Sequence, residues 1–150
     1  MRNLKRIVVK VGTKVITSKT RALDARRIEE IASQVAELID RGVEVIIVTS
    51  GAIGAGMSLL NLKKRPADLA HLQATAAIGQ NHLMRLYSQF FKRRFKKDVY
   101  VGQVLLTQED FDDRKRYLNI KHTVDTLLRH RAIPVINEND TVATDEIRCG

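Results

Sequence analysis

Residues 43–56 read VEVIIVTSGAIGAG, and this stretch decides which fold the chain can adopt. A mostly β-branched, apolar run leads directly into Thr49, Ser50 and Gly51. Such a near-continuous apolar run is typical of a strand that is buried on both faces of a parallel sheet. The glycines that follow indicate a tight turn into a helix, and small ligands bind at such turns in open α/β sheets. Backbone N–H groups at the helix start favour an anion, either a phosphate or a carboxylate.

Strands and helices alternate on both sides of this stretch. Residues 6–11 and 43–48 have the composition of strands, and the apolar spacing between them predicts a helix over 25–41, with Asp24 as its N-cap and Gly42 after its last turn. The other predicted elements are helices over 50–60 and 67–95, a helical region over 109–129, strands over 100–106 and 132–136, and a hairpin arm over 141–147. This alternation predicts an α/β protein, a three-layer α/β/α sandwich with a mostly parallel sheet.

Length and composition restrict the class of protein. A chain of 150 residues, 44% of them apolar, is long enough for one domain with a substantial core. No apolar run approaches the roughly 20 residues that a membrane span needs. The basic N-terminus is followed by an apolar segment, 7–9, that is too short for a signal peptide. Cys149 is the only cysteine, which excludes an intrachain disulfide and a cysteine-rich metal site. We therefore expect a cytoplasmic protein without membrane contact.

The net charge of +9 has two interpretations. It could serve to bind nucleic acid or a membrane, or it could be a solvated basic surface or attract anionic substrates. The densest basic cluster, residues 92–97, falls at the end of a predicted helix, where cations suit the helix dipole. No aromatic ladder alternates with these cations to stack on bases. The pattern favours the solvated surface and makes a nucleic-acid partner the less favoured alternative.

Polar residues follow three of the predicted strands, at 10–13, 49–51 and 137–140. If the strands are parallel, these three segments converge on one edge of the sheet. Lys10 would then place a positive charge where phosphoryl oxygens could be neutralised during a transfer reaction. An ordinary strand-end lysine that extends into solvent is the alternative, and the residue alone does not decide between them.

Ser50 could donate a hydrogen bond to a ligand carboxylate, next to the N–H groups of Gly51 and Ala52. It could equally be a simple helix N-cap, or serve both purposes. The glycine spacing GxxGxG differs from the dinucleotide fingerprint GxGxxG, and no G-K-[ST] sequence is present for a P-loop. The serine also lacks the GxSxG context of a hydrolase nucleophile.

Asn137, Asn139 and Asp140 offer oxygens that could bind a ligand ammonium group. Turn formation is the alternative, although two asparagines and an aspartate directly after a buried strand favour binding. The acidic residues over 109–113 suit a helix start, with counter-charges following at 114–116, better than a metal cluster. The four histidines show no paired metal-ligand spacing, so the sequence predicts no metal site of its own.

Three segments together resemble a known family. They are VVKVGT at 8–13, VTSGAI at 48–53 and INENDTVAT at 136–144, and the third is the most specific. The chain resembles the amino acid kinase superfamily over its whole length, and within it the kinases that act on glutamate. Further support comes from AAIGQ at 76–80 and GQVLLT at 102–107. The resemblance implies ATP-dependent phosphorylation of the γ-carboxylate of L-glutamate, with Mg²⁺, as the first step of proline synthesis.

The resemblance also implies roles for individual residues. It assigns Lys10 to the catalytic contact with the ATP phosphates, with Gly12 and Thr13 beside it. The implied glutamate-binding residues are Ser50, Gly51, Ala52, Asn137 and Asp140. A carboxylate needs no general base to attack phosphorus, so positioning and charge stabilisation would be sufficient for catalysis.

Relatives in this family continue beyond the equivalent of residue 150. We expect residues 1–150 to be the amino-acid-substrate part of the kinase domain, inactive alone, with the nucleotide-binding half and any PUA domain outside them. The family also implies a homo-oligomer. Two alternatives remain. One is a non-catalytic module that senses an amino acid or binds nucleic acid, and the other is a kinase for another carboxylate or for carbamate.

Overall fold

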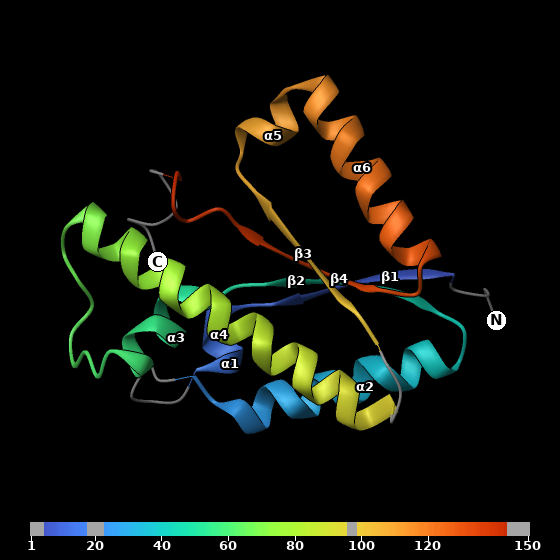
Figure 1. The fold of residues 1–150 in the computed structure, drawn as a ribbon, viewed down its shortest axis with the longest axis horizontal. Coiled ribbons are helices and arrows are strands. Elements are labelled where there is room, and N and C mark those ends of the chain that lie inside the picture. The colour runs from blue at the N-terminus through green and yellow to red at the C-terminus, as the bar shows by residue number, and fades with distance from the viewer. Residues whose placement is uncertain (1–4, 18–22, 96–98, 144–150) are drawn as a thin grey trace.

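Four parallel strands form the sheet that positions the site (Figure 1). The computed structural model describes residues 5–17, 23–95 and 99–143. The strands are β1 (Arg6–Val11), β2 (Glu44–Thr49), β3 (Val101–Leu106) and β4 (Ile133–Glu138). Their order in the sheet is β1-β2-β4-β3, so the two central strands come from distant parts of the chain. Because all pairings are parallel, every strand delivers its carboxyl end to the same edge.

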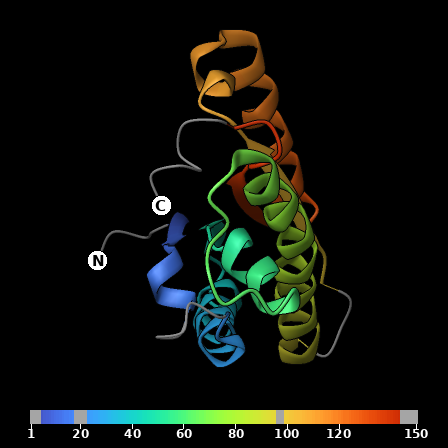
Figure 2. The same cartoon turned by 90° about the vertical axis from the view of Figure 1, so that its left-hand side faces the viewer.

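Helices cover both faces of this sheet (Figure 1, Figure 2). They are α1 (Thr13–Ile16), α2 (Ala25–Asp40), α3 (Ala52–Leu59), α4 (Leu69–Phe95), α5 (Glu109–Asp112) and α6 (Arg114–Arg129). Side chains of α2 and α4 pack on one face and those of α6 on the other. The predicted three-layer sandwich is confirmed. None of the helices in the described part of the chain is long and apolar enough to cross a membrane.

The larger core lies between the sheet and the pair of helices α2 and α4. Ile47 and Val135, from the central strands, are fully buried there. Helix α4 contributes Leu83, Tyr87 and Phe91, each with no exposed surface. A smaller cluster on the opposite face joins α6 to the central strands, and its buried members are Ile46, Val124 and Leu128. Helix α4 is therefore held firmly against the centre of the sheet, because burial of each large side chain contributes about 1.5–3 kcal/mol.

Both ends of α2 follow the local signals in the sequence. Asp24 accepts hydrogen bonds from the backbone N–H groups of Arg26 and Arg27, and Gly42 has the left-handed conformation (φ 81°) expected after a helix. The helical region predicted over 109–129 is instead two helices. The chain is extended at Asp113 (φ −88°, ψ 115°), and the side chain of this residue caps α6 by accepting from Arg116 N–H.

Two further elements differ from the sequence prediction. The four-residue helix α1 was not predicted. In the arm predicted over 141–147, residues 141 and 142 belong to a turn, and 144–147 lie outside the described residues. Among the described residues, β4 is therefore followed by a turn.

Helices α3 and α4 approach each other at two glycines. A Cβ atom added to Gly79 would overlap the backbone carbonyl of Ala52, and one added to Gly56 would overlap that of Thr75. Backbone therefore lies against backbone at both points. This contact fixes the first turn of α3, and with it the 49–51 segment, relative to α4.

We expect Gly79→Ala to destabilise the fold. Alanine favours a helix over glycine by about 0.5–1 kcal/mol, but overpacking against backbone costs about 1–3 kcal/mol or more, so the net effect is unfavourable. Chemical denaturation followed by circular dichroism measures it. Gly12→Ala is the control, since a Cβ there meets nothing within 4 Å. Equal stability of the two variants would contradict the close approach.

Candidate functional site

A cleft of about 730 Å³ lies at the carboxyl edge of the sheet. Its lining includes Lys10 in β1 and Gly12 after that strand, Thr49 at the end of β2 and Ser50 after it, and Asn137 in β4. The structure therefore brings together residues from all three polar strand ends that the sequence singled out. Much of the remaining wall comes from the segments that follow β3 and β4, and the second of these includes Asn139.

Ser50 is fixed by bonds to the neighbouring strand. Its backbone N–H and its hydroxyl both donate to the carbonyl of Val11, at 3.1 and 3.2 Å, and the hydroxyl of Thr13 donates to Ser50 Oγ at 3.1 Å. Ser50 is not the N-cap of α3. That position belongs to Gly51, which has φ 99° and forms no side-chain capping bond. The N-cap alternative for Ser50 is therefore wrong, and the start of α3 carries no side-chain cap.

A side chain at Gly51 would be unfavourable for two reasons. The left-handed backbone is strained for other residues, and a Cβ would come within 2.9 Å of the Ile16 side chain. Ala52, directly after it, is buried at the first position of α3. These two residues follow Ser50 directly in the chain, and neither is among the residues that line the cleft.

Lys10 is exposed and lies on the α6 side of the sheet, in register with Val48. No residue in the described part of the chain forms an ion pair with its ammonium group. Those residues therefore do not neutralise the positive charge of Lys10, which can interact with an anion bound in the cleft. Thr13, also predicted for the phosphate side, contacts the site through Ser50.

The end of β4 separates the three polar residues predicted there. Asn137 is 5% exposed, and its Nδ2 donates to Gln80 Oε1 at 2.6 Å. Asn139 instead accepts from the Thr141 hydroxyl at 2.6 Å, which is turn chemistry. Asp140 is partly buried in the same turn and is not among the lining residues. Of these three residues, Asn137 and Asn139 line the cleft, and the side chain of Asn137 is held by Gln80 on α4.

The acidic segment after β3 also contributes to the cleft. Asp110 accepts from the backbone N–H of Thr107 at 2.7 Å and from its hydroxyl at 3.2 Å, and Arg116 binds its other oxygen at 3.0 Å. The bond from the Thr107 backbone, followed by its hydroxyl and the charge of Arg116, keeps the pKa of Asp110 below its usual value. Asp110 thus organises the helix start, as expected, and additionally lines the cleft.

Two side chains of α4 that were not among the candidate residues bond to the strand ends. Thr49 is 4% exposed and its hydroxyl lies 3.1 Å from that of Tyr87, while Gln80 bonds Asn137. Tyr87 has no motif around it that indicates chemistry. Gln80 ends the AAIGQ stretch at 76–80, which supports the family resemblance but assigns the glutamine no role.

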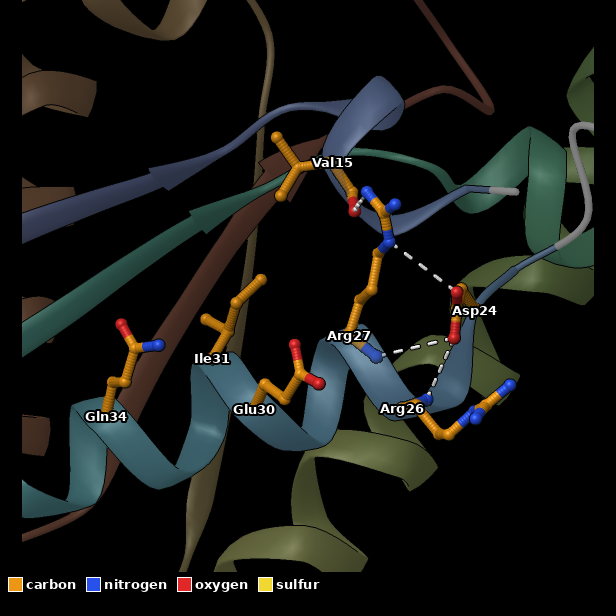
Figure 3. Close-up of a pocket in the computed structure, with 7 residues that line it drawn as sticks. All are labelled: Val15, Asp24, Arg26, Arg27, Glu30, Ile31 and Gln34. Carbon is orange, nitrogen blue, oxygen red and sulfur yellow. Dashed lines mark hydrogen bonds and ion pairs between the residues drawn. The ribbon is translucent and has the colours of Figure 1, made fainter. Parts of the chain in front are cut away.

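A second cavity of about 430 Å³ lies beside the N-terminal half of α2 (Figure 3). Arg27 donates there to the carbonyl of Val15 at 3.2 Å and lies 3.6 Å from the carboxylate of Asp24. Glu30 also lines it. Charges of both signs are therefore mixed, and none of the predicted site residues takes part.

The basic cluster at the end of α4 is partly compensated. Arg93 forms an ion pair with Glu29 at 3.2 Å and Arg94 with Asp40 at 2.9 Å, both on α2. Lys96 and Lys97 lie outside the described residues. These ion pairs favour the interpretation of the cluster as a solvated surface. Among the described residues, no group of three or more histidine, cysteine or acidic side chains could hold a metal ion.

Comparison with known proteins identifies the class. Residues 5–150 match the amino acid kinase family, and the chain belongs to that family. It is 50% identical over 145 residues to the glutamate 5-kinase of Thermoanaerobacter sp. (strain X514), and 52% identical to that of Caldanaerobacter subterraneus subsp. tengcongensis. Each alignment covers 97% of this chain and 38% of the relative. The chain thus spans well under half the length of these curated relatives.

Solved structures show the same fold. A carbamate kinase from Giardia lamblia bound to AMP-PNP superimposes with a TM-score of 0.56, over 93% of this chain and 57% of that one. A citric acid complex of the Giardia lamblia enzyme gives 0.55. The identities are only 14% and 12%, so these matches support the sandwich architecture and not a substrate.

Tyr87 generates a prediction about pH. Burial raises the pKa of its phenol above the usual 10.0, and the bond to Thr49 lowers it by less. The unfolded chain would therefore lose this proton first, so the stabilising contribution is complete below about pH 10 and is lost as the pH rises further. We expect the unfolding free energy, from urea titrations at pH 8–11, to fall less steeply in Tyr87→Phe.

Tyr117→Phe is the matched control, because Tyr117 is 46% exposed. This variant is expected to keep the slope of the unmodified chain. A Tyr87→Phe curve parallel to that of the unmodified chain up to pH 11 would show that the phenol titrates normally.

Proposed function

We propose that the cleft is the amino-acid site of a glutamate 5-kinase. The reaction transfers the γ-phosphoryl group of ATP to the γ-carboxylate of L-glutamate, giving L-glutamyl 5-phosphate and ADP, the first step of proline biosynthesis. The observation that carries the proposal is the convergence of Lys10, Ser50 and Asn137 around one cleft, with the start of α3 directly after Ser50. About half of the residues are identical to those of curated glutamate 5-kinases, which supports this choice within the family.

In this proposal, the acceptor carboxylate is held at the start of α3. The hydroxyl hydrogen of Ser50 is already donated to Val11, so Ser50 would have to redirect it towards a ligand. The backbone N–H groups of Gly51 and Ala52 are the complementary donors, and the helix dipole adds partial positive charge. A carboxylate is ionised at neutral pH and attacks phosphorus directly, so the protein supplies orientation and needs no general base.

The opposite end of glutamate would lie towards β4. Asn137 provides an amide oxygen and Asp140 a carboxylate, both suited to an ammonium group. Asp140 lies outside the present lining and would reach the ligand from the turn. Lys10, across the cleft, stabilises the negative charge on the phosphoryl oxygens as the bond to ADP breaks. Gly12 and Thr13 complete the phosphate side.

ATP and Mg²⁺ belong to the same proposal. Of the two described cations in the lining, Arg116 is paired with Asp110, which makes Lys10 the better group for a phosphate; the described residues offer no carboxylate cluster to the metal ion. We therefore assign no step to Mg²⁺, which in kinases is held largely by substrate phosphates. In this proposal residues 1–150 bind the amino acid, and the nucleotide is held mainly by the part of the relatives that the chain does not cover. A cytoplasmic homo-oligomer completes the proposal.

The charge of Lys10 can be tested kinetically in the full gene product that contains this chain. We expect Lys10→Met to reduce kcat about 100-fold, since loss of one electrostatic contact to a transition state costs about 10²–10³. The KM for glutamate should change little. Lys14→Met is the control, because Lys14 is exposed on α1 and outside the cleft lining. A kcat within twofold of the unmodified enzyme in Lys10→Met would exclude the assigned role.

Substrate binding at the β4 end can be tested separately by isothermal titration with L-glutamate. Asp140→Asn removes the charge but keeps the shape, and we expect the Kd to rise about 10- to 100-fold, the usual effect of losing a charge-assisted hydrogen bond. Asp112→Asn, on the exposed surface of α5, serves as the control. Identical affinities for L-glutamate in the two variants would show that Asp140 does not bind the substrate.

A further inference from the structure

Helix α4 packs on one face of the sheet and supplies hydrogen-bonding side chains to the strand ends at the site. The buried polar side chains in the described part include Thr49, Thr75, Gln80 and Asn137. Thr75 bonds within its own helix, to the carbonyl of His71 at 2.7 Å. The other three take part in bonds between α4 and the strand ends. Buried polar groups therefore concentrate where α4 meets the carboxyl edge of the sheet.

The two α4 side chains involved lie on one face of the helix. Gln80 and Tyr87 are seven residues apart, which is two helical turns. Tyr87 contacts the last residue of β2, Thr49, and Gln80 contacts Asn137 in β4. These strands are direct neighbours, with Val48 opposite Ile136. One helix therefore holds side chains from the ends of both central strands.

The bond between Gln80 and Asn137 determines what the asparagine offers to a ligand. Asn137 lines the cleft and uses its amide nitrogen to bind Gln80 Oε1. Its carbonyl oxygen and the second N–H of the same amide are then left, and the oxygen can accept a hydrogen bond from an ammonium group in the cleft. The opposite orientation of both amides would instead present N–H groups, which suit an anion.

Gln80 itself is left incompletely satisfied. Its Nε2 atom is buried and forms no hydrogen bond, the single such side-chain atom found among the described residues. An unpaired buried donor is unfavourable, so its presence in a native site requires an explanation. The geometry is explained if the Gln80 carbonyl oxygen is needed to accept the bond from Asn137, because that orientation of the amide leaves Gln80 Nε2 without a partner.

We propose that Gln80 is a positioning residue, which holds the Asn137 amide with its carbonyl oxygen towards the cleft to receive the ammonium group of the amino-acid substrate. This inference rests on the proposed function. Gln80 does not line the cleft and acts through Asn137. It differs in this respect from Lys10 and Ser50, which line the cleft themselves.

The test uses steady-state kinetics on the full gene product. Gln80→Leu removes the acceptor, and we expect the KM for L-glutamate to rise about 10-fold, with kcat and the KM for ATP within twofold. Gln80→Glu keeps an oxygen that can accept from Asn137 Nδ2 and is expected to restore the KM to within about twofold. Gln80→Met serves as a second apolar variant if Gln80→Leu folds poorly.

Thr75→Val is the matched control. Thr75 is on the same helix and equally buried, but its hydroxyl bonds within α4. We expect the thermal midpoint to change without any change in KM. An unchanged KM in Gln80→Leu, an equal rise in Thr75→Val, or a KM in Gln80→Glu as high as in Gln80→Leu would each overturn the proposal. Failure of the proposed function would differ, because the unmodified protein would then not phosphorylate glutamate at all.

Discussion

The parallel pairing of β2 with β4 is the constraint on which the site depends. Val48 lies opposite Ile136, so the residues that follow in each strand reach the same edge together. The turn after β2 carries the start of α3, and β4 carries Asn137. These groups are far apart along the chain, and no local interaction could bring them together. Strand pairing does so because parallel strands end on one side.

Helix α4 converts this pairing into a defined site. Its apolar side chains occupy the larger core, while Gly79 and Gly56 permit backbone contact between α3 and α4. Through Tyr87 and Gln80 the same helix bonds the ends of both central strands. One rigid element thus sets the relative position of the α3 start and of Asn137. A site supported in this way can fix a small substrate precisely enough for phosphoryl transfer, which depends largely on positioning.

Much of the fold was predictable because strong local patterns specify it. The apolar strands, the Asp24 cap and Gly42 all formed as expected. The break at Asp113 was not predicted, because an acidic residue inside a helical pattern has no periodicity that distinguishes a cap from an exposed position. The hydrogen bonding of Ser50 was difficult to predict for a related reason. Its bond to Val11 depends on the neighbouring strand, which a local capping rule does not include.

The sequence by itself determined the class of fold and the chain segments that provide the site, because strand composition, glycine turns and polar strand ends are local properties. Only the tertiary structure decided which of those residues line the cleft. It placed Lys10, Ser50, Asn137 and Asn139 there but not Asp140, and it gave Gln80 a partner in β4. The orientation of an amide depends on contacts between distant elements, and such contacts exist only once the helix has packed on the strands.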